Sequence, residues 1–404
     1  MQKISFNHLI ETIMFLYILS LYLLTYREDL NLISNAVALL LTFTIWINFI
    51  LTKRKLVFNK LLFLYAVFLI ICMISVYFAI DQDTAVTKVK TLLMIFILMV
   101  SLINYVDTFE KLRKTMIYFV YSGVIASIYI LFTTDFSQMS RLGGEIGNEN
   151  TVGVIIGISA IFCFYFLVEE KKYILFFPIL MMYLVILLTG SRSALLFSFI
   201  NLLLFLFLKN RNGLINKFKL IATSIISILV VSFLIFNVPI LYQIIGIRIE
   251  SMITIINGGN SNEGSINSRG YMVEAGIEMF KQRPISGYGI GNYGVVFSTY
   301  LGGWNTYAHN NIIELLVGIG ILGVIVYYFA QIIIIKDLVK ASRYSSHRKV
   351  TFIFISLITS YILLSVSSVY YYSKHFNIIL VIASIVGIIN KKDKIKIKQN
   401  HTKL

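Results

Sequence analysis

Twelve long apolar runs divide this chain of 404 residues, and the basic residues between the runs are sorted by side. Each run is long enough, or nearly so, to cross about 30 Å of hydrocarbon as a helix that rises about 1.5 Å per residue. We expect membrane-spanning helices at residues 12–26, 30–52, 61–80, 91–106, 115–134, 150–168, 173–191, 193–208, 220–247, 315–335, 350–373 and 376–390.

The distribution of charge predicts the orientation of these helices. If the N-terminus is cytoplasmic, the connections on that face hold 25 of the 35 Lys and Arg residues and 7 acids, which gives 25 − 7 = +18. The other face sums its 10 basic and 11 acidic residues to −1. The positive-inside rule assigns the basic face to the cytoplasm. Both termini are therefore expected there.

The composition excludes a water-soluble protein, because 58% of the residues are hydrophobic and only 13% are charged. The sequence predicts an all-α, polytopic membrane protein in which residues 1–404 form one domain. Basic residues in short juxtamembrane loops indicate topology and contacts with anionic lipid rather than nucleic-acid binding. Cys72 and Cys163 both lie within apolar runs, so we expect two buried thiols and neither a disulfide nor a metal site.

One connection, residues 248–309, is much longer than the others and rich in Gly, Asn and Ser. Long loops in compact proteins are commonly functional. We expect a helix in this loop that starts near Asn267-Ser268 and stops before Pro284. Apolar residues at helical spacing support it: Met272, Ala275, Gly276, Met279 and Phe280. Gly287, Gly289 and Gly291 follow without a preceding strand, which leaves a tight loop whose N–H groups could approach a phosphate or sugar.

The expected outer face is rich in arginine, since only four of its ten basic residues are lysines. The planar guanidinium group binds phosphate oxygens through two parallel donors, so a lipid diphosphate is a fitting ligand. Each group also has a simpler interpretation, as a snorkelling arginine, a solvated helix end or an interfacial histidine. The residues in question are Arg141, Arg192, Arg248, Arg269, Arg283 and His309.

Glu314 lies inside an expected span, where an acid costs about 2.5–3.5 kcal/mol near the helix centre and less toward the end. Such a residue needs a partner. Two interpretations stay open, a salt bridge or hydrogen bond to a neighbouring helix and a role in shaping a binding site.

Several of these motifs, in this order, resemble the O-antigen ligase and polymerase family. The resemblance covers roughly residues 140–325. Its motifs are Asn150 before a span, Leu188-Thr-Gly-Ser-Arg-Ser-Ala-Leu195, Ser268-Arg269, Pro284-Ile-Ser-Gly-Tyr-Gly-Ile-Gly-Asn292, His309-Asn310 with Glu314, and Gly318-Ile-Gly-Ile-Leu-Gly323. The family often has Trp shortly after the loop arginine, where this chain has Tyr271.

The resemblance implies a GT-C-like membrane glycosyltransferase of the bacterial cytoplasmic membrane that needs no metal or other cofactor. Its donor would be a glycan on undecaprenyl diphosphate, with the reaction on the outer face. By carry-over, Arg192 and Arg269 hold the diphosphate, and His309 acts as the base or orients the acceptor. The residues expected to bind substrate are Arg141, Asn150, Arg283, Asn310 and Glu314.

We expect a polymerase that joins lipid-linked repeat units, because the bias toward Ile, Asn and Lys is typical of low-GC organisms, many of which lack lipid A. A ligase that moves the finished glycan to a different acceptor stays open. So does a polysaccharide flippase or transporter, although the halves show no repeat and ionisable groups are nearly absent from the span centres. Expected partners are the glycan donor and acceptor, membrane lipid, a chain-length regulator and a flippase.

Overall fold

The computed structural model is a bundle of helices, and it describes residues 6–27, 29–135, 141–209, 214–257, 264–300, 302, 304–343 and 347–401. No strand occurs within these residues. The expected all-α membrane fold is confirmed: ten helices in the described ranges are long and apolar enough to cross a membrane, and two shorter apolar helices, Tyr173–Leu188 and Lys374–Ile389, accompany them.

The first half of the bundle contains eight helices. They are α1 (Phe6–Leu23), α2 (Asn31–Leu51), α3 (Lys60–Ser75), α4 (Gln82–Tyr105), α5 (Phe109–Thr133), α6 (Glu149–Glu169), α7 (Phe176–Leu188) and α8 (Arg192–Lys209). The second half has α9 (Leu214–Asn237), α10 (Pro239–Leu241), a π-helical turn (Tyr242–Gly246), α11 (Ile247–Ile256), α12 (Gly264–Gln282), α13 (Tyr293–Tyr300), α14 (Asn311–Ala341), α15 (Arg348–Leu364) and α16 (Lys374–His401).

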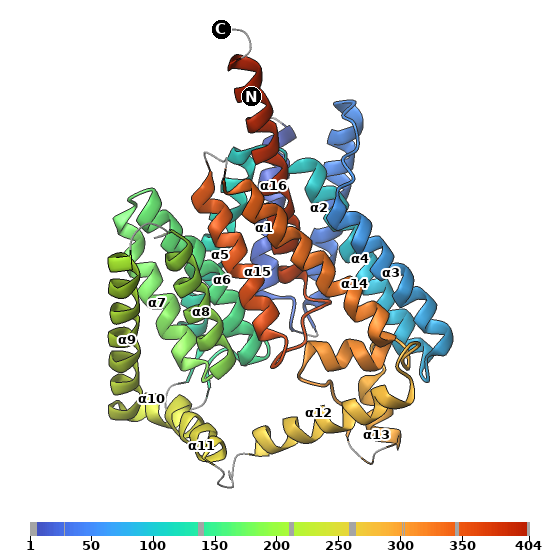
Figure 1. The fold of residues 1–404 in the computed structure, drawn as a ribbon, viewed down its shortest axis with the longest axis vertical. Helices are drawn as coiled ribbons and strands as arrows, with labels where there is room; N and C mark the ends of the chain where they lie inside the picture. Colours follow the sequence, from blue (N-terminus) through green and yellow to red (C-terminus); the bar gives the residue numbers. More distant parts are fainter. Residues whose placement is uncertain are drawn as a thin grey trace.

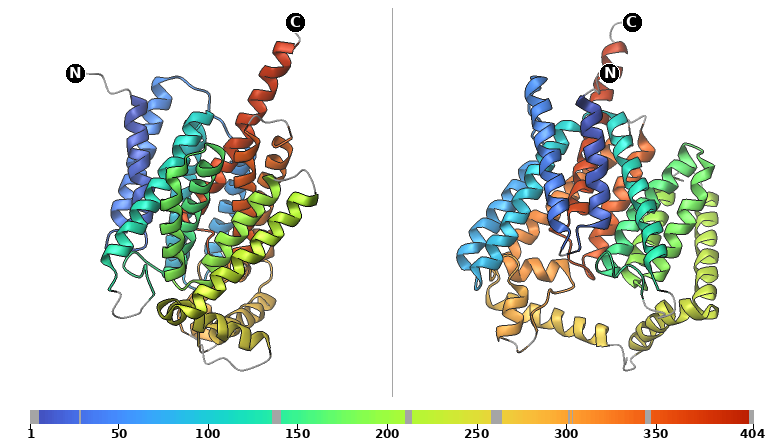
Figure 2. Two further views of the ribbon diagram at one scale, coloured as in Figure 1. Left: turned by 90° about the vertical axis from the view of Figure 1, so that its left-hand side faces the viewer. Right: turned by 180° about the vertical axis from the view of Figure 1, so that it is seen from behind.

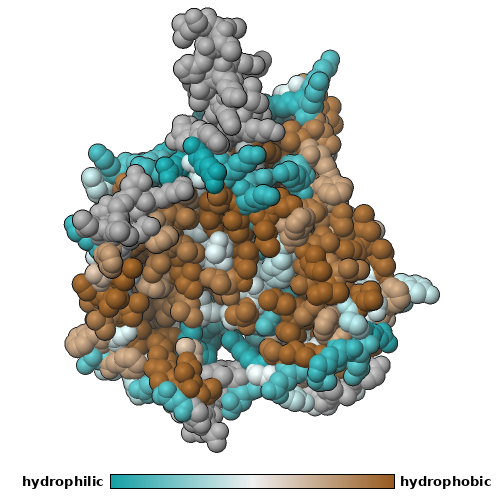
Figure 3. All heavy atoms as spheres, viewed as in Figure 1, coloured by the Kyte–Doolittle hydropathy of each residue, from teal (hydrophilic) through white to brown (hydrophobic). Residues whose placement is uncertain are grey.

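Both chain termini lie at one end of the bundle, here called the terminal end (Figure 2). Helices α11, α12 and α13 lie at the opposite end, the loop end (Figure 1). On the face that Figure 3 shows, a broad belt of hydrophobic residues covers the middle of the molecule, with hydrophilic residues at both ends. A belt of this kind is what a hydrocarbon environment requires of a helical bundle. The chain is therefore a multi-pass membrane protein.

Helix α6 forms the centre of the bundle, and its membrane window is 78% buried. Small residues allow its close contact with α8: a Cβ atom on Gly153 would approach Ala194 Cβ to 2.6 Å, and one on Gly157 would meet the Ser198 hydroxyl. Small residues at helix contacts are typical of membrane bundles, where backbones gain from close packing. Cys72 and Cys163 are buried free thiols, as expected.

The bundle departs from the expected boundaries after α8. A single span over 220–247 is not formed, because the helix ends at Asn237 and restarts at Pro239. Proline lacks the N–H group that a continuous helix needs at that position, and its ring disfavours helical geometry in the preceding residue. The chain then turns, so that α10 and α11 run across the loop end (Figure 1).

The predicted helix in the long connection is confirmed as α12, although it begins at Gly264, before the expected cap. Met272, Ala275 and Met279 are buried on its inner side, as the spacing indicates. They belong to a small hydrophobic cluster with Tyr293 and Val317. This cluster attaches the long connection to α14.

The glycine-rich loop after α12 packs against a kink in α14. Gly287 has φ 63° and faces the Gly318 carbonyl, and Gly320 interrupts the helix with φ 68°. The Tyr288 N–H donates to Val317 O at 2.8 Å, and the Ile321 N–H donates to Pro284 O at 2.9 Å. The glycine-rich loop and the kinked part of α14 therefore satisfy hydrogen-bonding groups of each other's backbone. The Tyr288 N–H group is used within the fold and is not offered to a ligand.

Replacing Gly287 by alanine should destabilise the protein by at least about 2 kcal/mol, because the backbone is left-handed and the new Cβ would lie 2.5 Å from Gly318 O. Gly270→Ala is the matched control: no atom lies within 4 Å of its added Cβ, and the helix should gain about 0.5–1 kcal/mol. Reversible unfolding in mixed micelles measures both. Equal stability of the two variants would contradict this account of the loop.

Candidate functional site

Tyr307 is the point at which several segments of the loop end meet. Burial raises the pKa of its phenol; the charge of Arg269 on α12 opposes this rise, and the charges of Glu314 on α14 and Glu149 on α6 add to it. These effects place all three charged groups within electrostatic range of one phenol, since salt screens exposed charges over about 8–10 Å. Segments that are far apart in sequence thus converge on the residues just before α14.

His309 stands beside Tyr307, with the two ring centroids 4.0 Å apart. Its backbone has φ 51°, a left-handed conformation that is uncommon for a residue other than glycine and often marks functional sites. Burial, together with the positive charge of Arg269, lowers the pKa of the imidazole from 6.5 to about 4. The imidazole is therefore neutral at neutral pH and can accept a proton or a hydrogen bond.

Two residues of α14 hold the His309 loop in place. Glu314 is 5% exposed, and its Oε2 accepts a hydrogen bond from the Ala308 N–H at 2.8 Å. Asn310 caps the helix, because its Oδ1 accepts from the N–H groups of Ile312 and Ile313 at 2.9 and 3.1 Å. Glu314 therefore has a hydrogen-bonding partner, as an acid in a span requires, and acts on His309 through the backbone.

A second group of polar residues joins α6 to the turn between α7 and α8. Arg141 Nε donates to Thr189 O at 2.8 Å, and its other guanidinium nitrogens contact Asn150 Oδ1 at 3.0 Å and Glu149 Oε2 at 3.4 Å. Arg141 and Asn150, two of the predicted binding residues, are thus in direct contact. Glu149 connects this group with Tyr307 and so with His309.

Arg192 begins α8, three residues after Thr189. Its Nη1 donates to the carbonyl oxygen of Arg248 at 2.6 Å, which brings α8 and α11 together. The left-handed Gly190 makes the turn possible, since a Cβ there would lie 2.7 Å from Ile244 O and 3.3 Å from Arg141 Cγ. Arg192 consequently lies on the Arg141 side of the loop end.

Arg283 takes a different position from the other predicted residues. It follows the C-terminal end of α12, fourteen residues after Arg269, which corresponds to roughly 20 Å along a helix axis. Its guanidinium carbon lies 4.5 Å from the centroid of the Tyr288 ring. The structure places Arg283 against the glycine-rich loop and away from Arg269.

Sequence reasoning did not select two charged residues near this site. In the sequence Glu149 is an ordinary acid in the first turn of a helix. In the structure it forms an ion pair with Arg141, and its charge acts on Tyr307. Lys88 of α4 lies within electrostatic range of Glu314, with its Nζ 3.7 Å from the centroid of the Tyr372 ring. The available signal for Lys88 was its place among the few lysines of the expected outer face.

Residues 176–328 match the model of the Wzy_C family, described as O-antigen ligase. This part of the chain is therefore similar to the O-antigen ligase domain. The expected resemblance to the O-antigen ligase and polymerase family is confirmed, and the match supports a glycosyltransferase-like enzyme. A search of curated proteins found no match to the chain.

The matched segment spans α7 to the first half of α14 and so includes Arg192, Arg269, His309 and Glu314. Arg141 and Glu149 precede it. The group formed by Arg141, Glu149 and Asn150 therefore adds residues from outside the matched domain to the candidate site, through the contacts to Thr189 and Tyr307.

Glu314→Ala should lower glycan transfer by about tenfold or more, because the Ala308 N–H loses its acceptor and the strained His309 backbone loses its support. Glu314→Gln is the informative comparison, since the amide oxygen can still accept that hydrogen bond. Activity of both variants is measured by polymer length on gels at matched expression. If the glutamine and alanine variants lose activity equally, the charge of Glu314 rather than its hydrogen bond matters.

Proposed function

We propose that this protein is a polysaccharide repeat-unit polymerase that takes its glycan from undecaprenyl diphosphate. The observation that carries the proposal is the arrangement around Tyr307, where Arg269 and the neutral imidazole of His309 lie within electrostatic reach of each other. The match to the O-antigen ligase family supports the glycan transfer itself. The family match also favours an enzyme over a flippase or transporter.

In the proposed reaction a hydroxyl group of the acceptor sugar attacks the anomeric carbon of the donor. A new C–O bond forms while the bond to the diphosphate oxygen breaks, and the hydroxyl proton passes to His309. Arg269 and Arg192 stabilise the negative charge that grows on the departing undecaprenyl diphosphate. Attack from the face opposite the leaving group inverts the configuration of the donor linkage.

The low pKa of His309 fits this role once substrate is considered. In the free protein burial, and in addition the charge of Arg269, lower the pKa of His309, so the imidazole stays neutral. A diphosphate bound to Arg269 would offset that charge and raise the pKa toward its usual range. The base would then become stronger when substrate binds.

The site would lie on the outer face of the cytoplasmic membrane, with both termini in the cytoplasm. The charge distribution supports this orientation, since the connections grouped with the termini carry 25 of the 35 basic residues. The donor would arrive there through a flippase, and a chain-length regulator would act on the growing polymer. Cysteine accessibility at Tyr307 and at Lys340, from either side of the membrane, tests the orientation.

Reconstitution of the purified protein with lipid-linked repeat units tests the polymerase proposal. We expect ladders of lipid-linked polymer that lengthen with time and without any other acceptor. A ligase would yield no ladder and would transfer glycan only to a separately supplied acceptor lipid. Movement of labelled donor across the bilayer without chain growth would indicate a transporter and contradict the proposal.

A further inference from the structure

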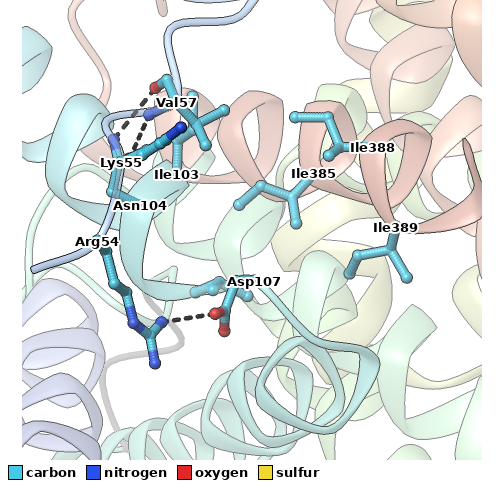
Figure 4. Close-up of a pocket in the computed structure, with 10 residues that line it drawn as sticks. Arg54, Lys55, Val57, Ile103, Asn104, Asp107, Ile385, Ile388 and Ile389 are labelled. Carbon is cyan, nitrogen blue, oxygen red and sulfur yellow. Dashed lines mark hydrogen bonds and ion pairs between the residues drawn. The ribbon is translucent and has the colours of Figure 1, made fainter. Parts of the chain in front are cut away.

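A cavity of about 190 Å³ opens at the terminal end, far from the candidate site. Three segments line it: residues 54–57 before α3, the C-terminal end of α4 and the second half of α16. Figure 4 shows Ile385, Ile388 and Ile389 of α16 on one side, opposite the segment with Lys55 and Val57. The cavity thus lies between elements that are distant in sequence.

The cavity combines an apolar wall with a basic mouth. Ile103, Ile385 and Ile389 are at most 7% exposed and form part of the hydrophobic core. The side chain of Arg54 is 37% exposed at the mouth, and Lys55 is exposed beside it. A soluble anion would gain nothing from the isoleucine wall, and a neutral hydrocarbon would gain nothing from the two cations.

The charge at the mouth remains positive after its ion pair is counted. Asp107 accepts from Arg54 Nη1 at 2.6 Å and from Lys111 Nζ at 2.8 Å. Among the residues that line the cavity, the two basic residues Arg54 and Lys55 against the one acid Asp107 leave 2 − 1 = +1. The described residues thus offer this cavity an excess of cations for a phosphate group.

The wall next to Lys55 is fixed in the absence of any ligand. Asn104 Oδ1 accepts from the Val57 N–H at 2.7 Å, and its Nδ2 donates to Val57 O at 3.2 Å (Figure 4). This reciprocal pair ties the segment before α3 to the end of α4. A preformed wall lowers the conformational entropy that the protein loses when a ligand binds.

We propose that this cavity binds an anionic phospholipid, with its phosphate at Arg54 and Lys55 and an acyl chain along Ile385, Ile388 and Ile389. The position supports this ligand, because the lining residues lie at the terminal end, where hydrophilic residues border the hydrophobic belt on the face that Figure 3 shows. Basic pockets between membrane helices on the cytoplasmic side are suited to anionic headgroups. The proposal concerns the terminal end alone and stands independently of the reaction at the loop end.

Native mass spectrometry of the full chain in detergent, titrated with phosphatidylglycerol or phosphatidylcholine, tests the proposal. We expect saturable binding of phosphatidylglycerol to the wild type, and about 25-fold weaker binding to the double variant Arg54→Ala, Lys55→Ala, since each basic residue contributes about fivefold near an anionic surface. The matched control is Lys336→Ala, Lys340→Ala, which removes two exposed charges of α14 outside the cavity and should bind as the wild type does.

A third variant, Ile388→Trp, separates a true cavity from general attraction to basic surface. It keeps both cations and fills the apolar space, so phosphatidylglycerol binding should fall as in the Arg54, Lys55 variant. Thermal unfolding of each variant reports its folding. Unchanged binding by a folded Ile388→Trp protein, equal binding of the two lipids, or complete displacement of the lipid by inorganic phosphate would each overturn the proposal.

Discussion

Arg269→Ala is expected to lower glycan transfer by about 10²–10³-fold, the usual cost of losing one preorganised group that stabilises transition-state charge. Arg269 is the cation that acts on both Tyr307 and His309, so its loss removes positive charge from the centre of the site. Single-turnover rates with a lipid-linked repeat unit, at saturating donor, measure the effect on the chemical step.

Lys281→Ala provides the control on the same helix. Lys281 is exposed on the α12 surface, and among the described residues it forms an ion pair only with Glu278, at 2.7 Å. The Lys281→Ala variant should therefore be as active as the wild type. Arg269→Lys keeps the charge but loses the planar fork, and should recover part of the rate. Wild-type activity of a folded Arg269→Ala protein would remove Arg269 from the mechanism.

His309→Ala is expected to slow transfer by about 10²–10⁴-fold, the range that a positioned general base contributes. The pH profile of the wild type tests this role separately, because a His309 that only supports the structure would leave no pH dependence of this kind. Because the pKa of His309 is about 4 in the free protein, kcat/KM should stay level from neutral pH down to about pH 5 and fall below it. The fall in kcat should lie at higher pH, since bound diphosphate opposes the charge of Arg269.

The lowered pKa of His309 also predicts how the stability of the protein depends on pH. The folded value of about 4 lies below the ordinary 6.5, so the unfolded chain binds more protons between these two pH values. The stability that His309 contributes is complete above about pH 6.5 and is lost as the pH falls toward 4. His309→Asn should flatten this part of the stability curve. An unchanged curve would show that the imidazole titrates normally.

Much of this fold could be predicted from the sequence because a membrane simplifies the problem. Apolar runs must become helices where no water can bind the backbone, and α1 to α8 therefore lie close to the expected ranges. The helix over Met272–Met279 was visible for a different reason, the spacing of its buried residues. Two helix ends were not predicted: the break at Pro239, which a continuous apolar run concealed, and the end of α15 at Leu364, nine residues before the expected end at residue 373.

The candidate site was less predictable because it depends on contacts between distant segments. Arg269 and His309 could be chosen from residue chemistry, yet nothing in the sequence showed that Glu149 faces Tyr307 or that Lys88 approaches Glu314. Asn310 shows the opposite case. Its residue type and position predict a substrate-binding residue, whereas in the structure its side chain caps α14.

Asn311 has a consequence for how the protein matures in the cell. Its Oδ1 accepts from the N–H groups of Tyr370 and Tyr371, at 2.9 and 3.0 Å, and its own N–H donates to Ser365 O at 2.7 Å. The start of α14 is thus anchored by residues that the ribosome delivers some sixty positions later. A nascent chain that has inserted everything up to α14 still lacks this anchor, so the start of α14 gains these hydrogen bonds only once the final helical hairpin is present.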